Sequence, residues 1–130
     1  MRGAVRLMAF NWAEYLNLAQ ALAAPATFNA ATLSADALAR CAISRAYYAA
    51  FCHARNYARD RHGLLLRYNG DDHSLIKRHF LQRRAHGVAH KLDKLRRLRN
   101  ECDYADVASD LPAKLADALS EAQMVIAILK

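Results

Sequence analysis

A long helix is predicted by residues 34–63, SADALARCAISRAYYAAFCHARNYARDRHG. Ser34 is a suitable N-cap, and Gly63 is suited to close a helix that runs to about Arg59. Between them one stripe of residues recurs at intervals of three and four, which is the spacing of a helix face. The stripe comprises Cys41, Ser44, Tyr48, Phe51 and Arg55, flanked by Leu38, Arg45 and Cys52. The stretch therefore favours a helical fold.

Four further helices are predicted around this one, from apolar residues at helical spacing and from the residues that bound them. Their boundaries are indicated by Asn11 and Pro25 for the first helix, Asp72 or Ser74 and Arg83 for the third, Gly87 and Cys102 for the fourth, and Asp110, Pro112 and Leu129 for the fifth. The chain has 130 residues, 55% of them hydrophobic, with only 4 Gly and 2 Pro. Sparse turn residues favour helices over many short strands. We predict a single-domain, all-α, antiparallel bundle of about five helices.

Two classes of protein are disfavoured by the sequence. No apolar run approaches the roughly 20 residues of a membrane-spanning helix, and Arg2 and Arg6 are not followed by the apolar stretch and cleavage site of a secretory signal. The cysteines, at positions 41, 52 and 102, are odd in number and show no C-x-x-C spacing. We expect them to be reduced core residues of a cytoplasmic protein with no membrane contact.

The positive charge is concentrated in the middle of the chain. Residues 55–99 hold 13 Lys/Arg and 4 Asp/Glu, a net of +9, whereas residues 100–130 hold 2 and 6, a net of −4. A basic surface of this kind suits a polyanion, with nucleic acid ahead of membrane because no amphipathic anchor is evident. The alternative is a solvated helix surface that has no anionic partner.

Two segments place an arginine and tyrosines among residues that otherwise suit a buried helix. They are SRAYYAAF at residues 44–51 and RNECDY at residues 99–104. Arg45 shares a helix face with mostly apolar neighbours, so it needs an acidic partner. We predict that Arg45 pairs with Asp103 across the two helices, and that tyrosine hydroxyls, including that of Tyr48, complete a structural network.

Four segments of the chain resemble the small, single-domain branch of the bacterial and archaeal HEPN proteins. They are FNWAEYL at residues 10–16, SRAYYAAF at 44–51, DHS at 72–74 followed by Ile76, and LRNECDY at 98–104. The resemblance covers nearly the whole chain in the family's order. It divides the sequence into an N-terminal extension, residues 1–9, and a HEPN-like helical domain, residues 10–130, with Met8 as the natural start.

The resemblance implies a bundle that forms homodimers and pairs with a minimal nucleotidyltransferase in toxin–antitoxin or phage-defence systems. Many relatives are ribonucleases that need no metal, and their motif is an arginine, a polar residue and a histidine four to six residues after the arginine. Arg99 and Asn100 match the first part, but Tyr104 stands at the histidine position and no histidine follows Arg99. Tyrosine, with an ordinary pKa of about 10, is a poor base at neutral pH.

Three functions therefore stay open. The first is binding of RNA or of a protein partner without cleavage, as the toxin-like component of such a pair. The second is a divergent ribonuclease in which Arg99 stabilises the transition state, Asn100 positions the phosphate, and Tyr104 or His73 acts as the base. The third is modification of Tyr104 by a nucleotidyl group from the partner enzyme. We expect no cofactor and no metal centre, because no set of three or four closely spaced ligands is evident.

Overall fold

The computed structural model describes residues 13–24 and 34–130, whose regular secondary structure is helical. The elements are α1 (Glu14–Leu22), α2 (Ala35–His62), α3 (Asp72–Gln82), α4 (His86–Tyr104) and α5 (Leu111–Ile128). The described residues contain no strand, so the prediction of an all-α bundle of about five helices is confirmed. The predicted N-cap at Asn11, the predicted helix end at Pro25 and the predicted extension over residues 1–9 lie outside the described residues.

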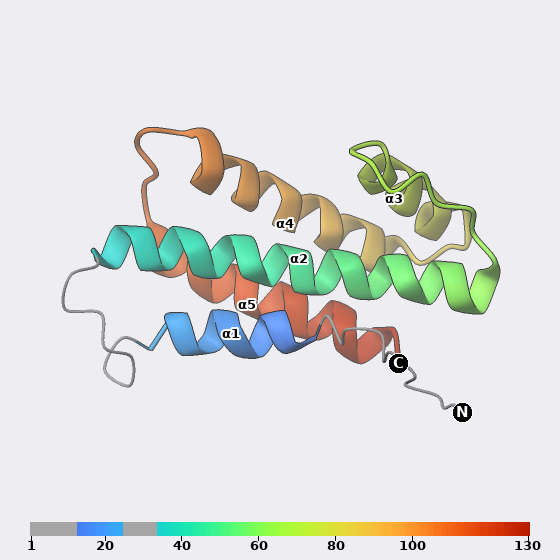
Figure 1. Cartoon of the computed structure of the whole chain (residues 1–130), viewed down its shortest axis with the longest axis horizontal. Coiled ribbons are helices and arrows are strands. Elements are labelled where there is room, and N and C mark those ends of the chain that lie inside the picture. The colour runs from blue at the N-terminus through green and yellow to red at the C-terminus, as the bar shows by residue number, and fades with distance from the viewer. Residues whose placement is uncertain (1–12, 25–33) are drawn as a thin grey trace, which may run out of the picture.

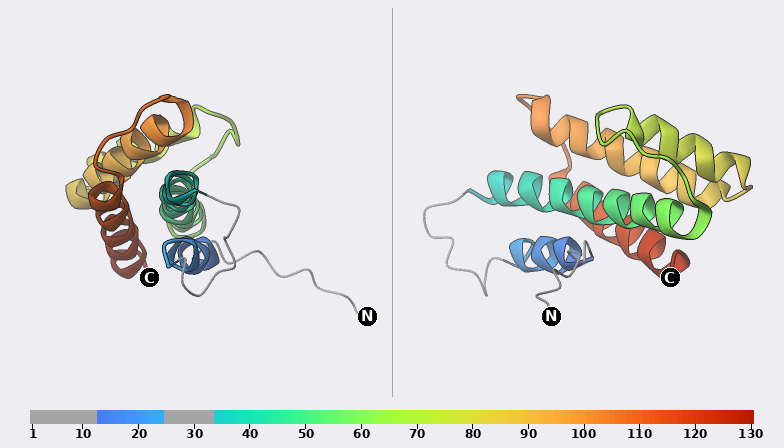
Figure 2. Two further views of the ribbon diagram at one scale, coloured as in Figure 1. Left: turned by 90° about the vertical axis from the view of Figure 1, so that its left-hand side faces the viewer. Right: turned by 45° about the vertical axis from the view of Figure 1, so that its right-hand side comes forward.

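Helix α2 is the centre of the bundle and contacts each of the other four helices. Helices α1 and α4 run opposite to α2 and α5 (Figure 1), so α1, α2, α4 and α5 alternate in direction along the chain. Helix α3 lies beside the C-terminal half of α2 and the first turns of α4 (Figures 1 and 2). This arrangement brings α2, α3 and α4 together on one side of the molecule.

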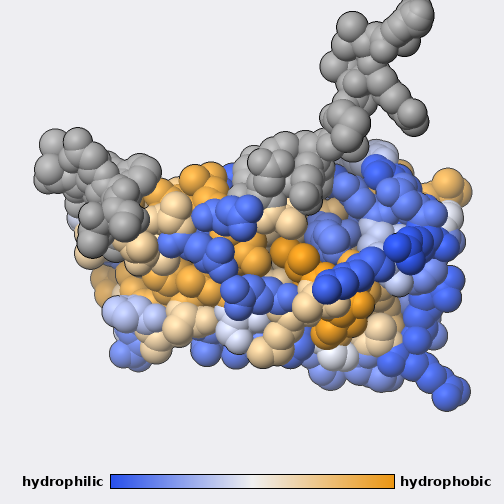
Figure 3. All heavy atoms as spheres, turned by 90° about the horizontal axis from the view of Figure 1, so that it is seen from below, coloured by the Kyte–Doolittle hydropathy of each residue, from blue (hydrophilic) through white to orange (hydrophobic). Residues whose placement is uncertain are grey.

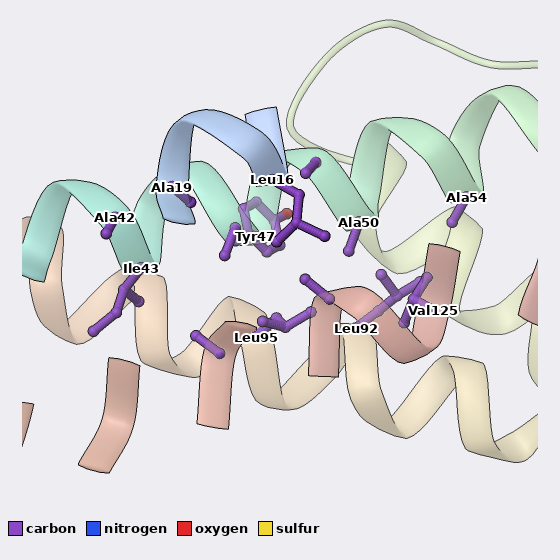
Figure 4. Packing of buried hydrophobic residues seen from close by; sticks show 14 of the residues in the cluster. Leu16, Ala19, Ala42, Ile43, Tyr47, Ala50, Ala54, Leu92, Leu95 and Val125 are labelled. Atoms are coloured by element: carbon purple, nitrogen blue, oxygen red, sulfur yellow. The ribbon is translucent and has the colours of Figure 1, made fainter. Parts of the chain in front are cut away.

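Small side chains on α2 allow its neighbours to pack closely. Its fully buried alanines are Ala42, Ala46, Ala49, Ala50, Ala54 and Ala58. Because the distance between packed helices depends on the side chains at the contact, a row of alanines permits a close approach. Larger side chains fill the remaining space, with Ile43 and Tyr47 of α2 facing Leu92 and Leu95 of α4 and Val125 of α5 (Figure 4).

Several predicted helix ends are confirmed. The Oγ of Ser34 accepts a hydrogen bond from the Ala37 N–H at 3.0 Å, and Gly63 ends α2 with a φ of +68°, a conformation that glycine adopts without strain. Asp110 is the N-cap residue of α5, and Pro112 lies in its first turn. These local signals mark both ends of α2 and the start of α5, two helices that pack against each other.

Two other predicted ends are wrong. Gly87 does not separate the third and fourth helices but lies in the first turn of α4; the chain reverses instead at Arg84, which has a φ of +61°. Neither Asp72 nor Ser74 caps α3, whose N-cap residue is Asp71 with no side-chain cap. The carboxylate of Asp72 binds the backbone of the preceding loop instead.

The surface on the α1 side of the bundle is partly apolar. Figure 3 views this face and shows apolar residues spread over much of it. Exposed apolar side chains of α1 and α5 include Leu18, Met124 and Ile128. No helix in the two described ranges is long and apolar enough to cross a membrane.

Candidate functional site

A cavity of about 260 Å³ opens between α2, α3, α4 and the loop before α3. Its wall combines side chains from four separate stretches of sequence. They are Tyr47, Tyr48 and Phe51 of α2, Asn69 and Gly70 of the loop, His73 of α3, and Arg96 and Arg99 of α4. The structure therefore brings together Arg99 and His73, two of the four residues that the sequence suggests for catalysis.

Arg99 is held in place by several neighbours. Its Nη1 donates to the Tyr48 hydroxyl at 3.2 Å, and its guanidinium carbon lies 4.9 Å and 5.4 Å from the ring centroids of Tyr47 and Tyr48. Its Nη2 donates to the side-chain oxygen of Asn100 at 2.8 Å. Asn100 thus orients the arginine and does not line the cavity itself. The Arg99 Nε is buried and has no hydrogen-bond partner among the described residues.

The predicted ion pair between Arg45 and Asp103 is wrong, because Asp103 pairs with a different arginine. Asp103 forms its ion pair with Arg99, 3.3 Å away and four residues earlier on the same helix. Arg45 lies with its guanidinium carbon 5.1 Å from the Tyr48 ring centroid, and it donates to the Ser44 hydroxyl at 3.3 Å. The i, i+4 neighbour reaches Asp103 first because both side chains lie on one face of α4. The tyrosine-centred network between the two helices therefore runs through Arg99.

His73 is buried against the aromatic wall of the cavity. Its ring stacks on Phe51 at a centroid distance of 5.9 Å, and its Nδ1 lies 3.1 Å from the Tyr47 hydroxyl. Burial, together with the positive charge of Arg96, lowers the pKa of His73 to about 4. The imidazole is therefore neutral at pH 7. Its Nε2 has no hydrogen-bond partner among the described residues, and the nearest carboxylate oxygen, on Asp93, is 4.0 Å away.

Tyr47 is a buried residue of α2 that also lines the cavity. Burial raises the pKa of its hydroxyl to about 12, so the hydroxyl keeps its proton at neutral pH. If the hydroxyl donates to Nδ1 of His73, the Nε2 of that imidazole carries the remaining proton; if it accepts from Nδ1, the Nε2 is a bare acceptor. The buried hydroxyl and imidazole therefore form one unit with two possible proton arrangements.

Arg96 adds a second cation to the rim. It is exposed and lies three residues before Arg99, so both arginines occupy one face of α4. No carboxylate in the described part of the chain lies within ion-pair distance of it. Sequence reasoning missed this residue, although its spacing from Arg99 could have indicated it. Two arginines, one of them without a carboxylate partner, make the cavity mouth strongly cationic.

The loop before α3 is fixed by one buried carboxylate. Asp72 is 2% exposed, and its two oxygens accept from the backbone N–H groups of Arg67 at 3.0 Å and Tyr68 at 2.7 Å. The side-chain oxygen of Asn69 accepts from the Asp71 N–H at 2.9 Å. These bonds define where Asn69 and Gly70 meet the cavity, and sequence reasoning, which treated Asp72 as a helix cap, did not foresee them.

Tyr104 lies apart from this group. Its side chain is 77% exposed, and it does not line the cavity. It follows Arg99 by five residues, which turns it about 140° around the helix axis at 100° per residue. Tyr104, which stands where the HEPN motif has its histidine, is therefore exposed to solvent, whereas the imidazole that lines the cavity with Arg99 comes from His73 of α3.

A larger cavity of about 570 Å³ lies between the start of α2 and the segment that joins α4 to α5. Its arginine, Arg40, is already engaged, since it donates to the carbonyl oxygens of Cys102, Ala105 and Asp106 at 2.9, 2.7 and 3.2 Å. The smaller cavity has the opposite character, because its cationic and polar groups retain unused hydrogen-bonding capacity. We therefore take the smaller cavity as the candidate functional site.

The fold and site define this chain as an all-α bundle with a cationic, tyrosine-lined cavity suited to an oxyanion. Comparison of the chain with protein-family models, with curated proteins and with solved structures found no match.

Proposed function

We propose that the chain is a HEPN-like RNA-binding protein that holds a backbone phosphate in the cavity at Arg96 and Arg99. The observation that carries this proposal is a pair of buried nitrogen atoms without a partner in the described ranges, Arg99 Nε and His73 Nε2, which belong to two residues that line one cavity. Arg99 Nε always carries a proton, and His73 Nε2 carries one when the Tyr47 hydroxyl donates to Nδ1. A buried donor without an acceptor costs free energy. A phosphate, with several acceptor oxygens, is a suitable ligand for these donors and for the guanidinium.

The surrounding charge supports a polyanion over a single small anion. Residues 55–99, which supply α3, most of α4 and the loop between α2 and α3, carry the net charge of +9. Two further arginines of this region, Arg67 and Arg78, line a cavity of about 230 Å³ on α3 and its loop, together with Asp71, which lies 3.9 Å from Arg67. Clustered arginines of this kind attract a nucleic-acid backbone along its length.

The protonation of the site favours binding over cleavage. Cleavage through the RNA 2′-hydroxyl needs a base whose pKa is close to the working pH. The pKa of His73 is about 4 and that of Tyr47 about 12, so neither group exchanges protons readily near pH 7. Arg99 and Tyr48 still supply charge and hydrogen bonds to a phosphate.

The test is the salt dependence of RNA binding by a matched pair of variants. Fluorescence anisotropy of a labelled single-stranded RNA gives the affinity between about 50 and 200 mM KCl. Arg96→Ala removes a cation of the cavity. Arg97→Ala makes the same charge change one residue away, at a side chain that does not line the cavity and pairs with Asp93 at 3.7 Å.

Wild-type affinity is expected to fall steeply with salt. Arg96→Ala is expected to weaken binding several-fold more than Arg97→Ala and to reduce the slope of log K against log salt by about 0.7. Equal effects of the two variants would mean that the cavity is not the binding site. If wild-type protein does not bind RNA at low salt, the proposal as a whole is overturned.

A second function, cleavage of the bound RNA, is favoured by the presence of Arg99 and His73 in one cavity. In that reaction the Nε2 of His73 takes the 2′-hydroxyl proton, the 2′-oxygen attacks phosphorus, and the bond from phosphorus to the 5′-oxygen breaks. The leaving 5′-oxygen takes a proton from water, and the imidazolium returns its proton to solvent. The products are a 2′,3′-cyclic phosphate and a 5′-hydroxyl end. Purified wild type, Arg99→Ala and His73→Gln are compared for these ends by mass spectrometry, with Tyr104→Phe as the control. Product from wild type and Tyr104→Phe alone would establish cleavage.

The resemblance to HEPN proteins adds two partners to the proposal: a second copy of the chain, and a minimal nucleotidyltransferase that the chain accompanies as the toxin-like component. The exposed hydroxyl of Tyr104 is accessible to such an enzyme. Light scattering on the purified chain tests for the dimer. Intact mass after co-expression with a minimal nucleotidyltransferase tests for modification, with Tyr104→Phe as the control. An unchanged mass would remove Tyr104 as an acceptor.

A further inference from the structure

Tyr68, in the loop just before the cavity-lining residues Asn69 and Gly70, combines an exposed side chain with an unusual backbone conformation. Tyr68 is 64% exposed and has a φ of +55°, a conformation that is strained for a residue with a bulky side chain. Glycine tolerates such a conformation without strain, but the glycine of this loop is Gly70, two residues after Tyr68. The strain persists because Asp72 binds the N–H groups of Arg67 and Tyr68. Strained residues that the surrounding structure holds in place are often found at functional sites.

Two arginines of α2 hold the ring of Tyr68 from one side. Arg59 Nη1 donates to its hydroxyl at 3.3 Å, and the guanidinium carbon of Arg55 lies 5.8 Å from its ring centroid. Arg59 is itself bound to the carboxylate of Asp60 at 2.7 Å. The ring is thus oriented by its neighbours while most of its surface stays in contact with solvent.

The residue that carries the ring is next in sequence to the cavity wall. Tyr68 directly precedes Asn69 and Gly70, both of which line the cavity wall. Because consecutive Cα atoms are about 3.8 Å apart, the backbone of Tyr68 adjoins the cavity wall at Asn69. An exposed aromatic ring beside a cationic groove is the arrangement with which proteins bind single-stranded nucleic acids.

We propose that Tyr68 is a stacking platform for a nucleobase of single-stranded RNA whose adjoining phosphate lies at Arg96 and Arg99. This inference rests on the proposed function and names its substrate class. A base stacks on the open face of the ring, opposite the face that Arg55 approaches. Stacking uses the π face that every base presents, so the platform binds RNA without strong sequence preference. A paired base within a duplex is not available to it.

The experiment compares hexa-adenylate binding by wild type and three variants. Tyr68→Phe keeps the ring, Tyr68→Leu removes it, and Tyr104→Leu removes another exposed tyrosine ring that lies outside the cavity. Tyr68→Leu is expected to weaken binding about tenfold or more with an unchanged salt slope, whereas Tyr68→Phe stays within a few-fold of wild type and Tyr104→Leu does not differ from it. Thermal unfolding verifies that each variant is folded.

A second readout reports stacking directly. Hexa-adenylate that contains one 2-aminopurine is expected to lose fluorescence when it binds wild type or Tyr68→Phe, and to keep it with Tyr68→Leu. If Tyr68→Leu binds and quenches like wild type while Arg96→Ala binds weakly, the stacking platform is overturned and the phosphate pocket stands. If wild type binds no hexa-adenylate, both proposals fall together.

Discussion

Arg99 on α4 donates a hydrogen bond to the hydroxyl of Tyr48 on α2 at 3.2 Å, and so joins residues 51 positions apart in the chain. The same guanidinium binds Asp103 and Asn100 on its own helix. Three side chains therefore hold the arginine that we place at the centre of the phosphate site. A phosphate that enters the cavity meets a cation whose position is already fixed, which limits the conformational entropy lost on binding.

The Arg99–Tyr48 bond is expected to contribute modestly to stability. Tyr48→Phe removes the hydroxyl and keeps the ring, so the free energy of unfolding is expected to fall by about 1 kcal/mol. Urea unfolding followed by circular dichroism measures the change. The control is Tyr104→Phe, at an exposed ring, where a change below about 0.5 kcal/mol is expected. Equal losses in the two variants would contradict the assigned bond.

The buried imidazole of His73 is expected to make stability depend on pH. Its pKa falls from an ordinary value of 6.5 to about 4, chiefly because burial disfavours its charged form. Between these values the unfolded chain binds a proton that the folded chain does not, so stability is full above about pH 6.5 and declines as the pH falls toward 4. The contribution lost over this window is on the order of 3 kcal/mol.

The measurement is urea unfolding at pH 7 and near pH 4 for wild type and His73→Gln, which cannot titrate. The variant is expected to lose less stability than wild type over this interval. Burial also lowers the pKa values of His62 and His79. The contribution of His73 is therefore the difference between the stability that wild type loses and the stability that His73→Gln loses over this interval. His90→Gln, at an exposed position on α4, is the control and should follow wild type. The same pH response in His73→Gln and wild type would count against the buried neutral imidazole.

Substitution of Asp72, the first residue of α3, is expected to destabilise the loop before that helix. Asp72→Asn replaces one acceptor oxygen with a donor that faces a backbone N–H, so a loss of about 2 kcal/mol is expected. Asp71→Asn, at a carboxylate that is exposed, is the matched control. Amide hydrogen exchange at Arg67 and Tyr68 should accelerate in the first variant alone. Unchanged exchange there would show that the carboxylate does not hold the loop.

Arg40 is expected to stabilise the end of α4. It donates to three backbone carbonyls around the last turn of that helix and the residues after it, groups that would otherwise lack a partner within the helix. Arg40→Lys keeps the charge but replaces the planar guanidinium with an ammonium group that cannot reach all three carbonyls. A loss of about 2 kcal/mol in the free energy of unfolding is therefore expected. Arg97→Lys, at an exposed side chain, should change stability little.

Local sequence signals predicted the helices well and the cavity only in part. The N-cap at Ser34 and the C-terminal Gly63 mark α2 because they satisfy the helix's own backbone groups, and such bonds depend on neighbours in sequence. Gly87 misled the prediction because a glycine is tolerated in the first turn of a helix. Arg99 and Asn100 were found from their segment alone, whereas Arg96 was overlooked although it shares the same helix face.

The sequence by itself determined that this chain is a helical bundle with its positive charge in the middle and an arginine on the fourth helix as a candidate for function. Only the tertiary structure decided which side chains join that arginine. His73 comes to it from α3, Tyr47 and Tyr48 come from α2, and Asp103 turns to Arg99 and not to Arg45. Helix periodicity states which face a residue occupies, but the meeting of two faces depends on how the whole bundle packs. Burial, which lowers the pKa of His73, exists only once that packing has formed.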